Sequence, residues 1–162
     1  MYDPFKDFKK FRLENGLEVH SVFWDRPWVG MEAIVHSGAR EDPLDMPGLA
    51  HFVEHCVCRN IPNREQNEVR HFFESTGGKV SFGCVDYLAT RYQFAVPAEP
   101  EIFREALAIF GSMLFDARIE KEIEHERKII YREFNQRYPF QEKLGWHMDL
   151  RRNLFKGHRL ET

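Results

Sequence analysis

The chain has 162 residues, of which 43% are apolar and 30% are charged, and its formal net charge is −3. This length and composition fit one globular domain with a buried core and exclude a disordered chain. Acidic and basic residues are interspersed and no run of about 18 apolar residues occurs, so the sequence predicts no nucleic-acid partner and no membrane span.

In chain order, the sequence begins with a predicted β-hairpin, because the pair Asn15-Gly16 separates two segments of strand character. A third strand and then two helices follow, separated by loops that contain proline and glycine. Asn63 is the predicted cap of the second helix. These elements are expected at residues 9–13 and 17–23 (hairpin), 28–37 (strand), and 48–58 and 63–74 (helices).

The second half continues with two strands rich in Val, Phe, Tyr and Thr, and then with three helices. The strands are expected at residues 79–88 and 89–96, and the helices at residues 101–115, 119–137 and 141–155. No repeat or linker interrupts this order. The pattern predicts one α+β domain over residues 1–162, with a mainly antiparallel sheet that helices cover on one face.

The helix expected at residues 48–58 carries His51, Glu54 and His55, whose spacing puts all three on one face. Two imidazoles one turn apart can bind one metal ion, and the carboxylate between them in sequence is placed to act on a metal-bound water. This His-x-x-Glu-His order is the inverted form of the common zinc-protease motif. From these residues alone, a helix that carries them without a metal is an equally good interpretation.

A catalytic zinc ion needs three protein ligands, so a third must come from elsewhere in the chain. The helix expected at residues 119–137 offers Glu126 and Glu133, which lie seven residues apart and therefore on one face. Apolar residues on the same helix indicate that it packs, and a carboxylate on a packed face is costly unless it is paired or bound to a cation. The alternative is that Glu133 is an ordinary solvent-exposed glutamate.

The three cysteines, Cys56, Cys58 and Cys84, are an odd number and predict no disulfide framework. Cys56 and Cys58 are two positions apart on one helix, so they point to different faces and are not expected to bind one ion together. Buried thiols in a reducing compartment are the favoured interpretation. The N-terminus also lacks the apolar core of a secretory signal, which favours a cytoplasmic protein.

After the His-x-x-Glu-His motif and just before it, several further segments match one known family of proteins, in the order in which that family has them. They are Ser37–Pro43 leading to Gly48–His55, then Gly77-Gly78, then Asp86, Thr90 and Tyr92, then Val96-Pro97, and last Glu126-Arg127 with Ile130 and Glu133. Together these segments, from Leu13 to Arg137, resemble the inverted-zincin (HxxEH) metallopeptidase family that includes pitrilysin, insulin-degrading enzyme and the mitochondrial processing peptidase.

The resemblance implies a zinc-dependent endopeptidase domain with a pitrilysin-type fold. His51, His55 and Glu133 would hold Zn²⁺, and Glu54 would be the general base that takes a proton from the zinc-bound water. Glu126 would accept a hydrogen bond from a ligand histidine and orient its ring.

The resemblance also implies a peptide substrate that adds as an extra strand beside residues 79–88, where Ser81, Phe82 and Gly83 would contact it. The family usually has Asn-Ala at the place of Ser81-Phe82, so the bulkier Phe82 is expected to narrow the site. The segment up to Thr90 is one residue longer than usual, which predicts a β-bulge. After His55 the family commonly ends this helix with Phe-Lys-Gly, where this chain has Cys58-Arg59-Asn60.

Family domains are longer than this chain and work in pairs, and the second domain supplies Arg and Tyr side chains to the reaction. The resemblance therefore implies either a catalytic-domain fragment, incomplete at its C-terminus and of low activity alone, or a chain that needs a homologous partner domain or subunit. An open sheet edge would also favour self-association.

Two other functions stay open beside the enzyme. One is a non-catalytic or partner-dependent subunit that binds or processes peptides, in which family members often lose a motif residue. The other is a structural zinc site, which is disfavoured because such sites usually have four protein ligands, often thiolates.

Overall fold

The computed structural model describes residues 6–43, 45–59, 61–121, 123–137 and 153–157. Within these ranges the strands are β1 (Phe8–Arg12), β2 (Glu18–Val22), β3 (Trp28–Val35), β4 (Lys79–Val85) and β5 (Thr90–Pro97). The helices are η1 (Ala39–Glu41), α1 (Leu49–Arg59), α2 (Gln66–Ser75), α3 (Pro100–Phe115), η2 (Ile119–Lys121) and α4 (Ile123–Arg137).

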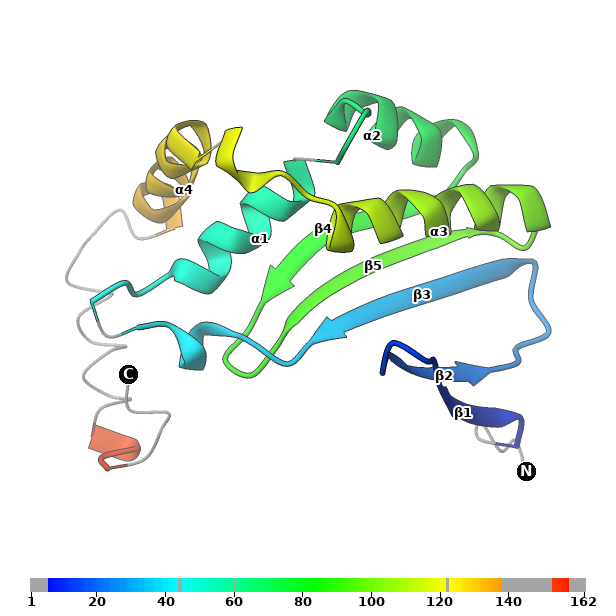
Figure 1. Cartoon of the computed structure of the whole chain (residues 1–162), viewed down its shortest axis with the longest axis horizontal. Helices are drawn as coiled ribbons and strands as arrows, with labels where there is room; N and C mark the ends of the chain where they lie inside the picture. Colours follow the sequence, from blue (N-terminus) through cyan, green and yellow to red (C-terminus); the bar gives the residue numbers. More distant parts are fainter. Residues whose placement is uncertain (1–5, 44, 60, 122, 138–152, 158–162) are drawn as a thin grey trace.

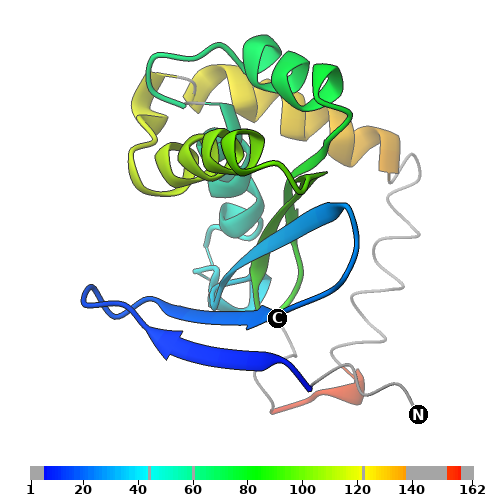
Figure 2. The same ribbon diagram turned by 90° about the vertical axis from the view of Figure 1, so that its right-hand side faces the viewer.

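Strands β3, β5 and β4 form an antiparallel sheet in that order, and β1 and β2 form a separate hairpin (Figure 1). Helices α1 and α2 contact β4, and α3 contacts β5, so the helices cover one side of the sheet. In both views the hairpin lies beyond β3, away from these helices (Figure 2). The predicted α+β class with an antiparallel sheet covered on one face is confirmed.

The core forms where β5 packs against the helices. Side chains of β5 alternate between buried and more exposed positions, and Tyr92, Phe94 and Val96 are the buried set that faces the helices. The Phe94 ring centroid lies 4.8 Å from that of Phe110 in α3 and 5.9 Å from that of Phe73 in α2. This aromatic cluster fixes the helices to the strand that lies at the centre of the sheet.

Two helix boundaries differ from the prediction. Asn63 has a φ angle of 60°, whereas the cap of an α-helix has an extended backbone, and helix α2 is capped instead by Glu65. The Glu65 N–H donates to the carboxylate of Glu68, which completes a reciprocal capping box. The helix expected at residues 119–137 is divided into η2 and α4. Most of the helix expected at residues 141–155 lies outside the described residues.

The predicted β-bulge is present and lies in β4. The pairing with β5 shifts by one position between Ser81 and Cys84, so that Phe82 and Gly83 together face Tyr92. Within the described ranges β4 pairs with β5 alone, which makes it an edge strand. None of the described helices is long and apolar enough to cross a membrane.

Candidate metal centre

Helix α1 is held at its start by a side chain from the preceding loop. The backbone N–H groups of Gly48 and Ala50 donate to the two carboxylate oxygens of Asp42, and the N···O distance is 2.7 Å in both bonds. A carboxylate at this position satisfies N–H groups that have no partner inside the helix, and it stabilises the positive end of the helix dipole. Asp42 was predicted only as part of a loop. Its role here is to fix the first turn of the helix that carries the motif.

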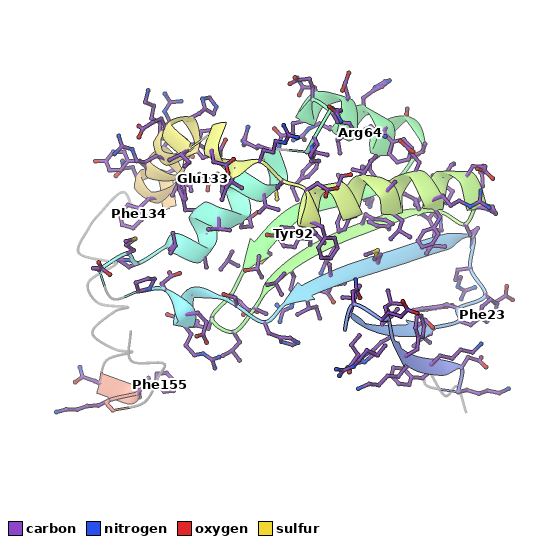
Figure 3. All side chains as sticks on the ribbon, viewed as in Figure 1. Phe23, Arg64, Tyr92, Glu133, Phe134 and Phe155 are labelled. Atoms are coloured by element: carbon purple, nitrogen blue, oxygen red, sulfur yellow. The ribbon has the colours of Figure 1, made fainter. Side chains whose placement is uncertain are left out.

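The structure brings His51, His55 and Glu133 together. The two Nε2 atoms of the histidines are 3.2 Å apart, and Glu133 Oε2 lies 3.5 Å from Nε2 of His55 and 3.8 Å from Nε2 of His51. Helix α4 packs against α1, and Glu133 lies on the side of α4 that faces α1 (Figure 3). Two side chains from one helix and one from a remote helix therefore converge on one point.

This geometry fits a tetrahedral zinc ion. Zinc–ligand bonds of about 2.0–2.1 Å in tetrahedral geometry put neighbouring ligand atoms about 3.3 Å apart. The observed separations of 3.2, 3.5 and 3.8 Å are close to that value, and the three ligand atoms all lie within 4.8 Å of one another. Two imidazoles and one carboxylate leave the fourth position of a tetrahedron for water, as in catalytic zinc sites.

Glu126 is fully buried behind the candidate ligand His55. Its Oε2 atom lies 3.1 Å from Nδ1 of His55, so a proton on Nδ1 donates to the carboxylate and leaves the Nε2 lone pair for a metal. The other oxygen, Oε1, lies 2.8 Å from Nε of Arg59 in an ion pair that lacks the alignment of a hydrogen bond. A buried carboxylate is costly without partners, and Glu126 has a hydrogen-bond donor on one side, His55, and a charge partner on the other, Arg59.

Glu54 lies between the two histidines and strand β4. Its Oε2 atom is 3.9 Å from Nε2 of both His51 and His55, and the residue is 8% exposed. Burial raises the pKa of Glu54 above its ordinary value, and the nearby His55 works against this shift. Its second oxygen, Oε1, faces Cys58, whose Sγ atom lies 3.7 Å away.

Cys58 is buried on the same face of α1, one turn after Glu54. Its thiol also contacts the main-chain carbonyl oxygen of Phe82 in β4. Burial, reinforced by the neighbouring Glu54 carboxylate, raises the pKa of the Cys58 thiol well above its usual range. Cys58 therefore carries its proton and is a hydrogen-bond donor at neutral pH. Cys56 is also buried, as the sequence predicted for both residues, whereas Cys84 is exposed.

The bulge of β4 brings Gly83 against Glu54. A Cβ atom added at Gly83 would overlap the Glu54 carboxylate, so only glycine leaves room for that side chain. Phe82 packs instead against the hydrophobic core, with the Arg70 guanidinium carbon 5.8 Å from its ring centroid. Ser81 is exposed and lines a 470 Å³ hollow on the strands. Of the three residues expected to contact substrate, Gly83 is the one that the structure places at Glu54.

Sequence reasoning missed the roles of Cys58 and Arg59, although a spacing rule could have found that of Cys58. Cys58 follows Glu54 by four residues, so the two share a helix face, whereas Arg59 pairs with Glu126 of the remote helix α4. Contacts between Gly83 and Glu54 carry no such local signal, because they join a strand to a helix.

The sequence of most of the chain matches one family of known proteins. Residues 27–161 match the family described as Insulinase (Peptidase family M16). The chain belongs to the insulinase family. The resemblance seen in the sequence is thereby confirmed.

Individual members of the M16 family are similar to this chain over most of its length. The uncharacterized zinc protease YmxG of Bacillus subtilis is 27% identical over 130 residues, which are 77% of this chain and 30% of YmxG. The crystal structure of the periplasmic protease PqqL from Escherichia coli has a TM-score of 0.78 and 25% identity, over 95% of this chain and 18% of PqqL.

An M16 domain that is described as inactive has the same fold. This domain, from Pseudomonas fluorescens, has a TM-score of 0.80 and 14% identity, over 95% of this chain and 37% of that chain. Its likeness shows the fold alone.

This chain spans less than a third of the length of YmxG and less than a fifth of the length of PqqL.

Proposed function

We propose that this M16 chain is a zinc-dependent endopeptidase domain that cleaves peptide bonds in peptides or unfolded segments. The observation that carries the proposal is the convergence of His51, His55 and Glu133 on one point, with Glu54 Oε2 3.9 Å from both rings. A metal-binding triad with a buried carboxylate beside its open position is the arrangement that metal-assisted hydrolysis requires.

In this proposal His51, His55 and Glu133 hold Zn²⁺, which supplies a Lewis acid and lowers the pKa of a water molecule. Glu54 accepts a proton from the attacking water at Oε2 and later delivers it to the leaving amine. Its position between the rings and the edge strand supports this role, because the attacking water and the scissile bond must both be within its reach.

Glu126 is the residue that orients His55. Its Oε2 atom accepts a hydrogen bond from Nδ1 of His55, and the charge of Arg59 stabilises the carboxylate form. Partners of this kind fix the ring orientation of a ligand histidine and raise its basicity. Their removal is expected to weaken metal binding without removing a ligand.

Substrate peptides are proposed to add to the free edge of β4 as a further strand. In the described part of the sheet, the outer edge of β4 has no neighbouring strand, and its bulge lies at Glu54. Main-chain hydrogen bonds along such an edge give affinity with little demand on sequence. The same free edge would allow self-association of the isolated chain.

A second homologous domain or subunit is proposed to complete the active enzyme. The support is that the chain spans 30% of YmxG and 18% of PqqL, so the related proteases contain much more than this unit. The isolated chain is accordingly expected to bind zinc and to cleave peptides poorly, with full activity in the full-length protein.

The test combines zinc analysis with cleavage of a quenched fluorescent peptide by the full-length protein. Wild type should bind one Zn²⁺ per chain and lose activity with chelator. Glu54→Gln should keep the zinc and lose cleavage, whereas Glu133→Gln should lose both. Full cleavage by Glu54→Gln would contradict the assignment of the base, and unchanged zinc content in Glu133→Gln would contradict the ligand set.

The alternative function is a non-catalytic or partner-dependent subunit that binds or processes peptides. The observation in its favour is the fold that this chain shares with the M16 domain described as inactive. Retention of His51, Glu54, His55 and Glu133 favours the enzyme. A full-length protein that binds zinc and peptide but cleaves none of a broad peptide set would support the alternative.

A further inference from the structure

The carboxylate of Glu54 has two oxygens in different surroundings. Oε2 faces the candidate metal centre, 3.9 Å from the Nε2 atoms of His51 and His55. Oε1 faces Cys58, 3.7 Å from Sγ. A carboxylate that acts as a base must hold one oxygen toward its proton source, so a donor on the opposite oxygen would keep it in that orientation.

We infer that Cys58 is a positioning residue for this base. Its single S–H has two acceptors within reach, and it donates to Oε1 of Glu54 because a carboxylate is a stronger acceptor than the Phe82 carbonyl. This bond holds Oε2 toward the metal centre. The same thiol contacts the carbonyl oxygen of Phe82, so it also ties the bulge of β4 to the helix that carries Glu54. This role rests on the proposed function of Glu54 and extends it to a residue that touches neither metal nor substrate.

The surroundings of the Cys58 thiol, and not its burial, distinguish this role from simple packing. Cys56, on another face of α1, is as deeply buried as Cys58, with exposed fractions of 1% and 3%. A cysteine that only filled space would need no acceptor, yet the Cys58 thiol lies between a carboxylate and a backbone carbonyl. Gly83 lies against the same oxygen, Oε1, of the Glu54 carboxylate, so the backbone of β4 also confines that side of the group.

The direct test is infrared spectroscopy of the S–H stretching bands, which move to lower frequency when the thiol donates a hydrogen bond. It uses the zinc-free chain, and comparison of wild type with Cys58→Ser assigns the Cys58 band. Glu54→Gln should move this band to higher frequency, because a neutral amide accepts more weakly than a carboxylate, and the Cys56 band should stay in place. A Cys58 band that does not move would overturn the inference.

The second test measures peptide cleavage and zinc content of full-length variants. Cys58→Ala should lower kcat by about fivefold to tenfold, which is the effect of one lost hydrogen bond, with KM and zinc content unchanged. Cys58→Ser should recover part of the loss, and Cys56→Ala is the matched control that should retain wild-type kcat. Equal kcat values for Cys58→Ala and Cys56→Ala would overturn the inference. If wild type cleaves nothing, the proposed function fails, while the infrared result still decides the contact.

Discussion

The Nε atom of Arg59 lies 2.8 Å from Oε1 of Glu126, and this pair joins the end of helix α1 to a fully buried carboxylate of α4. The opposite oxygen of Glu126 contacts Nδ1 of His55. A charge at the partly exposed end of one helix is thereby connected to a candidate metal ligand through a side chain with no access to solvent. Docking of α4 onto α1 and the orientation of His55 therefore depend on the same contacts.

Replacement of Arg59 by glutamine should weaken both folding and metal binding. It leaves Glu126 buried with one partner fewer, and because Arg59 is one-third exposed we expect a loss of about 1–3 kcal/mol in the free energy of unfolding. Zinc affinity should fall by about 10-fold to 100-fold. Urea unfolding and zinc titration measure the two effects.

The matched control is Arg127→Gln, which breaks an exposed pair with Glu124 at 3.0 Å and should cost less than about 1 kcal/mol. Equal effects of the two variants would show that the Arg59–Glu126 contact has no special weight.

Substitution of Gly83 by alanine should abolish cleavage in the full-length protein and leave zinc bound. The added Cβ would overlap the Glu54 carboxylate and displace it. The candidate ligands lie on α1 and α4, and none of them is among the atoms that the Cβ would meet. Gly30→Ala in strand β3, on the other side of β5, is the control, since a Cβ there has no atom within 4 Å. Peptide cleavage and zinc content are the measurements. Wild-type activity in Gly83→Ala would mean that Glu54 has another productive position.

Zinc should stabilise the chain through its three candidate ligands. Binding to the folded state alone adds about 2.7 kcal/mol to the free energy of unfolding at a zinc concentration one hundred times the dissociation constant. We expect Tm to rise with zinc in wild type and to change little in Glu133→Gln. His125→Gln, on the same helix at an exposed position, should behave as wild type. An equal rise of Tm in Glu133→Gln would place the metal elsewhere.

Asp86 should make stability depend on pH in the acidic range. Its Oδ1 accepts hydrogen bonds from the N–H groups of Leu88 and Ala89, and these bonds, with the charge of Arg91, lower the pKa of Asp86. A lowered pKa gives stability that is present above the ordinary aspartate pKa and is lost as the pH falls through the folded-state pKa.

Asp86→Asn keeps an acceptor oxygen but removes the charge. Wild type should therefore be the more stable at neutral pH, and the difference should shrink as the solution is acidified below the ordinary aspartate pKa. Urea unfolding of both proteins, at neutral pH and below the ordinary aspartate pKa, measures this difference in the free energy of unfolding. A difference that is independent of pH would show that the charge of Asp86 contributes nothing.

Local periodicity was sufficient to predict most of the fold. Alternation along the strands and the four-residue spacing on α1 depend on near neighbours in sequence, and both were predicted from the residues alone. Glu133 could not be chosen from its helix, where it resembles any exposed glutamate, and only the family resemblance singled it out. The predicted cap of α2 was wrong. Asn63 is a better capping residue by type than Glu65, but its left-handed backbone excludes it from that position.

Contacts between remote elements carried no signal in the sequence. Gly83 meets Glu54 at the bulge of β4, where the pairing with β5 shifts by one position. Arg59 meets Glu126 only once α4 has docked. Both depend on tertiary packing, which no pattern of neighbouring residues encodes.

The candidate ligands lie on two helices that are separated by about half of the chain, since His55 and Glu133 are 78 positions apart in the sequence of 162 residues. An ion that binds both residues would act as a cross-link between α1 and α4. By analogy with a disulfide across a similar span, it would remove about 4–5 kcal/mol of chain entropy from the unfolded ensemble. Under this proposal a nick between α3 and α4 would leave two fragments that stay associated in the presence of metal and separate with chelator.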